Sequence, residues 1–330
     1  MNESTVECQL CGSSGPHRLL TVREMMFGSR ERFDYFNCAN CGSLQCATVP
    51  TDDVLARHYG AGYYSYNESA RLSPLGWLAH QQDRYELGLG RSVVGAAISR
   101  ILPERVVRAV ITGNIIKMFG ALQVARDARI IDVGCGGGAL LDRLARLGFS
   151  QLSGADPFIA ADGVTPLGIP LAKRQLNELP GEYDVIMFNH SLEHVRDFVG
   201  TLKAAREKLS AGGCCLVRVP TTSSEAWETY QENWVDIDAP RHIVIPSRQG
   251  MTMAADRVGL RVSQVFDDST FFQFIASEAY RRDVELSDPK LFWKMLRVFG
   301  PKRLWDWEKR AERLNNEGRG DRVGFALRPC

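Results

Sequence analysis

A glycine-rich turn between a strand and a helix constrains the fold of this chain more than any other feature. Residues 129–134 read RIIDVG, a short β-branched strand that runs directly into Gly134, Gly136 and Gly138. The helical pattern ALLDRLARL of residues 139–147 follows at once. Such a succession indicates an α/β domain whose ligand lies against bare backbone at the amino terminus of the helix.

A second strand adds a carboxylate to this unit. Residues 151–156, QLSGAD, end at Asp156, which is suited to hold a ribose diol. The glycines alone leave two cofactors open, because Gly134, Gly136 and Ala139 also satisfy the dinucleotide pattern G-x-G-x-x-A. NAD and S-adenosylmethionine (SAM) therefore compete at this point.

A third segment separates these two cofactors. Residues 182–195, EYDVIMFNHSLEHV, describe a buried strand that opens into a polar turn. The ordered motifs DVGCGGG, Asp156, YDVI and SLEHV resemble a class I SAM-dependent methyltransferase, from about residue 126 to the carboxyl terminus. The resemblance implies an α/β, Rossmann-like, seven-stranded sheet, mostly parallel with an antiparallel last strand. Residues 209–219 resemble its fifth strand and residues 320–327 its last.

The same resemblance implies which residues bind the cofactor. The backbone of the three glycines would contact the methionine part of SAM, and Asp132 would position its amino group. Asp156 would hold both ribose hydroxyls. Gln175 occupies the adenine-side position, where the family often has an acidic residue, and Asn189 would lie beside the sulfonium.

Three histidines are candidates for catalysis. Methyl transfer is an in-line displacement, so alignment of the acceptor contributes most. A sugar hydroxyl must also lose a proton to a base such as histidine, whereas a carboxylate or phosphate acceptor needs no base. We rank His190 and His242 ahead of His194, and Asp238 would orient the His242 ring if a turn joins them. Each histidine has a packing or capping role as its alternative, and for Glu193 the alternatives are a contact with ligand or a cap on a helix that begins near His194.

Four of the nine cysteines have metal-binding spacing. Two C-x-x-C-G knuckles, at Cys8 and Cys11 and at Cys38 and Cys41, are separated by 26 residues. Four thiolates predict a closed, structural zinc site. Two unrelated buried pairs, or a redox role, are the alternatives. Such a zinc ribbon before a methyltransferase domain resembles a bacterial group associated with sugar and surface-polysaccharide biosynthesis.

Composition limits the partners of this chain. Its 40 Lys+Arg and 39 Asp+Glu give a formal charge of +1, so nucleic acid is disfavoured as a partner. Without an apolar run of about 20 residues, or a signal-like amino terminus, we expect a cytoplasmic protein. Between residues 91 and 117 five basic residues accompany one acid, which predicts either peripheral contact with the inner face of the membrane or ordinary packed helices.

The sequence therefore predicts three parts, which are a zinc ribbon (1–50), a helical connector or cap (51–125) and a SAM-dependent methyltransferase domain (126–330). The predicted activity is O-methylation of a small or glycan-linked acceptor, with a sugar hydroxyl favoured. One alternative is a methyltransferase that acts on RNA or protein through the ribbon. The other is a non-catalytic SAM-binding scaffold. The sequence assigns neither the methylated atom nor an oligomeric state.

Overall fold

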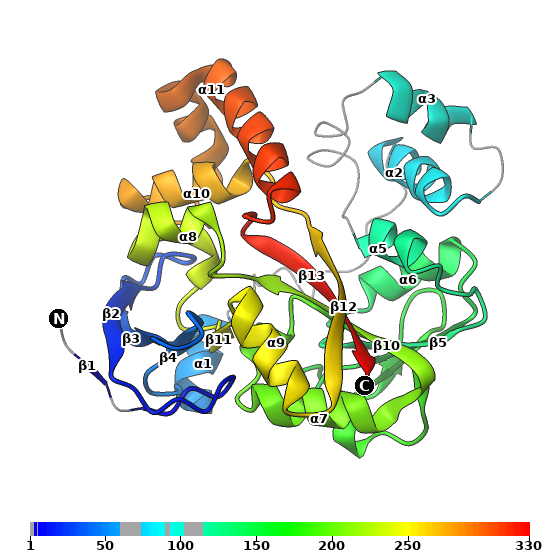
Figure 1. Ribbon diagram of the computed structural model, residues 1–330. Helices are drawn as coiled ribbons and strands as arrows, with labels where there is room; N and C mark the ends of the chain where they lie inside the picture. The colour runs from blue at the N-terminus through cyan, green and yellow to red at the C-terminus, as the bar shows by residue number, and fades with distance from the viewer. Residues whose placement is uncertain (1–2, 5, 60–73, 90–92, 102–114) are drawn as a thin grey trace.

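The computed structural model describes residues 3–4, 6–59, 74–89, 93–101 and 115–330 (Figure 1). These residues form a large mixed sheet covered by helices, and a smaller antiparallel sheet near the amino terminus. The large sheet has the order β12-β13-β10-β9-β5-β6-β8-β7. Its strands are β5 (Arg129–Val133), β6 (Gln151–Ala155), β7 (Gly163–Val164), β8 (Pro170–Ala172), β9 (Tyr183–Asn189), β10 (Leu209–Pro220), β12 (Leu260–Asp267) and β13 (Arg322–Pro329).

The predicted Rossmann-like sheet is confirmed. The strands from β10 through β9, β5 and β6 to β8 are parallel, while β13 pairs antiparallel with both β10 and β12. The two-residue strand β7 adds an eighth, antiparallel strand beside β8, at the edge of the seven that were expected. β5 pairs with β6 on one side and with β9 on the other. The strand order therefore reverses at β5, where open α/β sheets bind their ligands.

The central strands are buried on both faces, as parallel strands between helices must be. In β9, Val185 and Met187 belong to one core cluster, while Ile186 and Phe188 belong to the other. The first cluster includes residues of α5 (Ile115–Ala121) and α6 (Ala139–Arg146). The second includes residues of α7 (Phe198–Lys208) and α9 (Arg248–Asp256). Alternation with period two explains why β9 is almost entirely apolar in sequence.

The connector contains α1 (Asp52–His58), α2 (Pro74–Glu86) and α3 (Val93–Ile101) before α5. Part of the segment predicted to contact a membrane, residues 91–92 and 102–114, lies outside the described residues. At its end, α5 buries Ile115, Ile116, Met118 and Phe119 in the core, so this helix packs against the sheet. Within the part of the chain that the structure describes, no helix combines the length and the apolar character needed to cross a bilayer.

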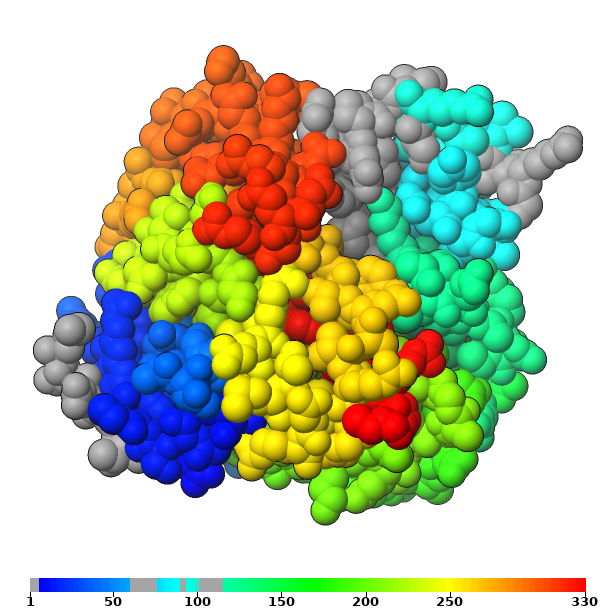
Figure 2. Space-filling view, viewed as in Figure 1, coloured from blue at the N-terminus to red at the C-terminus, as the bar shows by residue number. Residues whose placement is uncertain are grey.

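The amino-terminal sheet is completed by a strand from far along the chain. Its order is β1 (Glu3–Ser4), β2 (His17–Arg23), β3 (Arg32–Asn37), β4 (Leu44–Cys46) and β11 (Val244–Ile245). β11 pairs antiparallel with β4, and Leu10, Leu44 and Met251 share one core cluster. In Figure 2 the ribbon lies directly against the surface of residues 245–260. The ribbon is therefore built into the larger domain.

The remaining helices lie above the ribbon and beyond the antiparallel edge of the large sheet in Figure 1. They are α8 (Glu225–Tyr230), α10 (Phe272–Arg281) and α11 (Leu291–Asn316). The chain also contains short 3-10 turns, which are η2 (Leu176–Glu178), η3 (Leu192–His194), η4 (Gln231–Asn233) and η5 (Val235–Ile237). α11 bends where Gly300, at φ 72°, precedes Pro301. Phe274 and Tyr280 in α10 are buried, whereas Phe271 and Phe272 at its start are half-buried.

Candidate active site

The glycine turn after β5 has the backbone that its sequence predicts. Gly134, Gly136 and Gly138 all have positive φ, at 79°, 51° and 76°. A Cβ at Gly134 would lie 2.4 Å from Cβ of Ser191, and one at Gly138 would lie 2.4 Å from Cγ2 of Thr165. Residues with a side chain are therefore disfavoured at both ends of the turn, because the positive φ values strain them and because neighbouring side chains occupy the space. The turn leaves bare backbone at the start of α6.

Two predicted carboxylates meet this turn. Asp156 accepts hydrogen bonds from the backbone N–H groups of Gly136 (3.0 Å) and Phe158 (2.8 Å), one at each carboxylate oxygen. Each oxygen keeps a second acceptor position, which a ribose hydroxyl can use. Asp132 is buried in β5, and burial together with the charge of Asp156 raises its pKa to about 7. The two carboxylates therefore fit a ribose and an amino group, as the resemblance implies.

The other two residues predicted to contact the cofactor, Asn189 and Gln175, lie in different parts of the fold. Asn189 ends β9, and its Oδ1 accepts from Nη1 of Arg218 at 3.3 Å. Gln175 is exposed and caps η2, where its backbone N–H donates to Oε2 of Glu178 at 2.7 Å. Asn189 thus joins the carboxyl edge of the central strands, and the adenine role of Gln175 stays a prediction. A cavity of about 360 Å³ at the opposite end of the strands, lined in part by Asp184 and Arg328, contains none of these residues.

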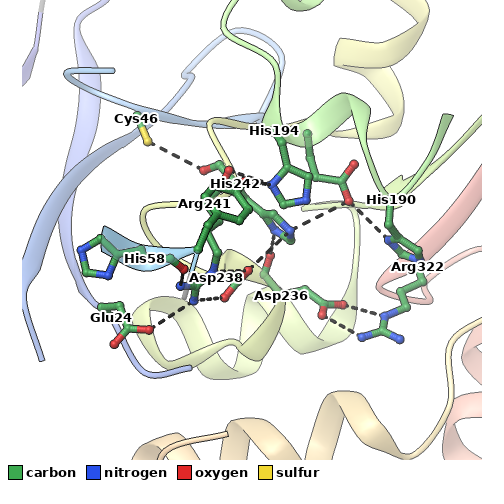
Figure 3. A network of polar contacts seen from close by, with 12 residues as sticks. Glu24, Cys46, His58, His190, His194, Asp236, Asp238, Arg241, His242 and Arg322 are labelled. Atoms are coloured by element: carbon green, nitrogen blue, oxygen red, sulfur yellow. Dashed lines mark hydrogen bonds and ion pairs between the residues drawn. The ribbon is translucent and has the colours of Figure 1, made fainter. Parts of the chain in front are cut away.

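The structure brings the three predicted histidines together beyond the end of β9 (Figure 3). His190 directly follows β9 at φ 56°, and its side chain is 27% exposed. Nδ1 of His190 lies 3.3 Å from Oε1 of Glu193. Burial and the nearby Arg218 and Arg322 hold the pKa of His190 well below its usual range. His190 is therefore neutral at pH 7 and has a ring nitrogen able to accept a proton.

His194 and His242 form a pair behind His190, with ring centroids 4.7 Å apart. Nδ1 of His194 lies 2.9 Å from the carbonyl oxygen of Arg241, and Nδ1 of His242 lies 2.7 Å from that of Asp236. A carbonyl only accepts, so both Nδ1 atoms carry the hydrogen and both Nε2 atoms keep a lone pair. Burial, and then the facing His242, lower the pKa of His194 to about 3. Burial likewise lowers the pKa of His242.

Glu193 is a site residue for which the sequence left two roles open and assigned neither. Its interpretation as a helix cap is wrong, because η3 is a single turn and α7 begins later, at Phe198, with Asp197 as its cap. Glu193 is fully buried between His190 and His242, and its Oε2 has no hydrogen-bond partner. Burial raises its pKa to about 8. The signal in the sequence was the dipeptide Glu193-His194, which places two polar groups after a buried strand.

Asp238 does not orient the His242 ring by a hydrogen bond, since Oδ2 of Asp238 lies 3.9 Å from Nε2 of His242. Asp238 instead pairs with the fully buried Arg241, whose Nε lies 2.9 Å from Oδ2 of Asp238. Arg241 also donates to Oε1 of Glu24 at 3.2 Å and to the carbonyl of His58 at 2.9 Å. The segment after residue 236 is thereby tied to the ribbon, and the ring is held by the carbonyl of Asp236.

The ribbon supplies part of the wall around these histidines. The Tyr35 hydroxyl in β3 donates to the carbonyl of His242 at 2.8 Å, and the Tyr59 hydroxyl lies 3.1 Å from Nδ1 of His194. On the other side, Arg322 of β13 makes two hydrogen bonds to Asp236, at 2.9 and 3.0 Å. The site beyond β9 is therefore polar, and its groups come from segments spread over the whole chain.

The four predicted cysteines converge in the ribbon. Sγ atoms of Cys8 and Cys41 are 3.7 Å apart, those of Cys11 and Cys38 are 3.6 Å apart, and all four lie within 4.8 Å of one another. The two knuckles have the same geometry, since Gly12 and Gly42 both have φ 74° and each donates to the carbonyl of the first cysteine of its knuckle at 2.8 Å. Sulfurs around zinc sit about 3.8 Å apart when Zn–S bonds are about 2.3 Å. The donor set therefore fits a tetrahedral zinc ion.

Comparison with known proteins agrees with this fold. A methyltransferase-domain family profile matches residues 100–265, half of the chain. The chain therefore belongs to the methyltransferase-domain family.

Curated relatives are similar over shorter stretches. A ubiquinone biosynthesis O-methyltransferase of Ruegeria pomeroyi is 32% identical over 116 residues, which are 31% of this chain and 45% of the relative. One of Azorhizobium caulinodans is 30% identical over 185 residues, 52% of this chain and 62% of the relative. The chain thus spans about half the length of the curated relatives it matches.

Solved structures are similar at low sequence identity. The O-methyltransferase from the trans-AT PKS multienzyme of Brevibacillus brevis, in complex with S-adenosyl-L-homocysteine, is 14% identical with a TM-score of 0.40, and the match covers 75% of this chain and 79% of that one. The cyclopropane synthase MmaA2 from Mycobacterium tuberculosis is 15% identical with a TM-score of 0.41, over 66% of this chain and 85% of that one.

Proposed function

We propose that this chain transfers a methyl group from SAM to a hydroxyl of a small or glycan-linked acceptor, with a sugar of nucleotide-sugar or surface-polysaccharide biosynthesis favoured. One observation carries the cofactor assignment, which is the meeting of the glycine turn, Asp132 and Asp156 at the carboxyl edge of the sheet. This arrangement occurs in a chain of the methyltransferase-domain family, which supports SAM over NAD.

In this proposal each residue has a limited task. Bound SAM supplies an electrophilic methyl group. Asp132 holds the amino group of SAM, and Asp156 holds its ribose hydroxyls. Nδ1 of His190 faces Glu193, and in the tautomer that carries its hydrogen on Nδ1 the lone pair of Nε2 takes the proton that the acceptor hydroxyl loses as it attacks. The backbone contact of His190 with Arg218, 2.8 Å from N–H to carbonyl oxygen, fixes the start of the turn that carries the ring.

The polarity of the wall supports a hydroxyl-rich acceptor. Asp236 and Arg322 lie beside the histidines, and replacing the water around such groups by apolar surface costs free energy. A sugar offers them hydrogen bonds, whereas a flat apolar ring offers few. The names of the curated relatives favour an intermediate of ubiquinone biosynthesis as a second candidate.

We assign the four ribbon cysteines to a structural zinc ion. Four thiolate ligands fill a tetrahedral site and leave no open position for an acceptor. The ion would hold the ribbon against the wall of the acceptor site, through Tyr35 and its hydrogen bond to the carbonyl of His242. A cytoplasmic location, with peripheral membrane contact through residues 91–117, remains a prediction that suits a lipid-linked acceptor.

The test is a methyl-transfer assay with unfractionated acceptors. The purified chain is incubated with methyl-labelled SAM and cell extract, and label is then separated into nucleotide sugars, lipid-linked glycans, quinone precursors, RNA and protein. Asp156→Ala is the inactive control, and Asp162→Ala, at an exposed aspartate six residues later, is its matched variant. We expect label in a sugar-containing fraction, lost with Asp156→Ala and kept with Asp162→Ala.

Other outcomes change the proposal in defined ways. Label in quinone precursors would replace the sugar by the second candidate, and label in RNA or protein would make the ribbon a recognition module. Binding of SAM without label in any fraction would favour the scaffold alternative. Thermal protection by NAD equal to that by SAM would contradict the cofactor assignment itself.

A further inference from the structure

Three side chains beyond β9 present metal-binding atoms to one point. The carboxylate of Glu193 and one ring nitrogen from each of His194 and His242 all lie within 4.8 Å of one another. Figure 3 shows the rings of His194 and His242 close together, and Nε2 of His242 lies 3.9 Å from Oε1 of Glu193. Ligands of a tetrahedral zinc ion lie about 3.4 Å apart, because its bonds to nitrogen and oxygen are about 2.1 Å. Small side-chain rotations would close the difference.

The two histidines are already held as metal ligands usually are. A ligating histidine donates its other ring N–H to a carbonyl or carboxylate, which fixes the ring and keeps the ligating nitrogen unprotonated. Here the carbonyls of Arg241 and Asp236 take the Nδ1–H groups of His194 and His242. Both Nε2 lone pairs are therefore available, and Nε2 of His242 lies 3.9 Å from Oε1 of Glu193.

The carboxyl group between the rings has no cationic partner in the described part of the chain, and it keeps its proton at pH 7 while such a partner is absent. Glu193 is fully buried and its Oε2 has no hydrogen-bond partner. Among the described residues, the two arginines whose charge acts on Glu193 have other carboxylate partners, since Arg218 pairs with Asp268 and Arg322 pairs with Asp236. A buried carboxylate is stable when it is paired or coordinates a metal. A cation between Glu193 and the two rings would satisfy that requirement.

We propose that Glu193, His194 and His242 bind one divalent transition-metal ion, with zinc as the ion to test. Two imidazoles and a carboxylate form a ligand set that zinc uses in catalytic sites, where the fourth position stays open to water or substrate. The open position here would take an oxygen of the acceptor, beside His190. The ion would polarise that oxygen and fix its direction toward the methyl donor. The site differs from the ribbon cluster in ligands and in having an open position.

The experiment counts metal on the full-length chain. Metal is removed with a chelator, the protein is reloaded with Zn²⁺ or Co²⁺, excess ion is removed, and bound metal is measured by mass spectrometry and by the visible spectrum. We expect two equivalents in the wild type, one from each cluster. Cobalt held by four thiolates has an intense sulfur-to-metal charge-transfer band, whereas cobalt held by histidines and a carboxylate has only weak visible bands.

Two variants test the assignment. His242→Ala and the isosteric Glu193→Gln should each lose the second equivalent, with affinity weakened more than about ten-fold, while the thiolate band remains. His80→Ala, on α2, is the matched control and should keep both equivalents. If His242→Ala fails to fold, Glu193→Gln decides, because it preserves the shape of the site.

Two results would overturn the proposal. One is a reloaded wild type with a single equivalent, all of it in the thiolate band. The other is a second equivalent that persists in both variants. The measurement uses no methyl acceptor, so its failure would leave the proposed methyltransferase activity standing, and failure of that activity would leave the metal count standing.

Discussion

The proposed cofactor side and the proposed acceptor side of the site are built in opposite ways. The cofactor side is local, because the glycine turn, Asp132 and Asp156 lie within one strand, turn, helix and strand. The acceptor side is assembled from distant segments, including Glu24 in the ribbon, the Glu193 turn, the segment of Arg241 and His242, and Arg322 in the last strand. A site built from neighbouring residues can be predicted from the sequence, because its residues form one continuous motif. Assembly from distant segments ties its geometry to the stability of the whole fold.

The largest expected effect lies on the acceptor side. Arg241→Met should lower the free energy of unfolding by about 3–5 kcal/mol, because it leaves the buried carboxylates of Glu24 and Asp238 without their partner. Urea denaturation measures this loss. The matched change is Arg196→Met, at an exposed ion pair with Asp52, where less than about 1 kcal/mol is expected. Equal losses in the two variants would show that the buried network does not hold the acceptor side together.

On the cofactor side, Gly134→Ala should lower the free energy of unfolding by about 2–3 kcal/mol and also weaken SAM binding. The positive φ accounts for about 1–2 kcal/mol, and the close approach of Ser191 adds to it. Gly148→Ala is the control, since its φ is 90° but no atom lies within 4 Å of the added Cβ. It should show only the backbone effect and leave SAM affinity, measured by calorimetry, unchanged.

A smaller effect should appear in the pH dependence of cofactor binding. The pKa of Asp132 is raised to about 7, so its carboxylate forms between pH 6 and 8 and SAM should bind about ten-fold more tightly at pH 8 than at pH 6. Without SAM the sign reverses, because the folded carboxyl keeps a proton that the unfolded chain releases above about pH 4. Stability then falls as pH rises toward 7. Asp132→Asn should abolish both trends, and an unchanged pH profile in that variant would assign them to another group.

The smallest expected effect concerns the contact between ribbon and acceptor side. Tyr35→Phe removes the hydrogen bond to the carbonyl of His242 and should lower the free energy of unfolding by about 1 kcal/mol. Thr21→Val removes the exposed hydrogen bond to Asp34, and a change below about 0.5 kcal/mol is expected. Thermal melts compare the two. No difference between them would mean that the ribbon is positioned by its shared sheet and core alone.

The difference between a local site and a site assembled from distant segments also explains which features can be predicted from the sequence. The Gly134 turn, the strands on either side of it and the paired cysteine knuckles are patterns of adjacent residues with a known backbone requirement, so they are readable without a structure. Glu193 and Arg241 belong to no recognisable local motif, and their roles depend on which residues from distant parts of the chain contact them. The same limit explains Asp238, for which sequence spacing to His242 suggests a partner, whereas the fold gives it Arg241.

The pairing of β4 with β11 has a consequence for how the chain acquires its structure. About two hundred residues separate these strands, and contacts of such long sequence separation form slowly because a large loop must close first. During synthesis from the amino terminus, the β4 edge of the ribbon emerges long before its partner and stays unpaired until residues 244–245 follow. The ribbon therefore completes its sheet only after strands β5 to β10 of the large sheet have been synthesised, which ties the last step of ribbon formation to the larger domain.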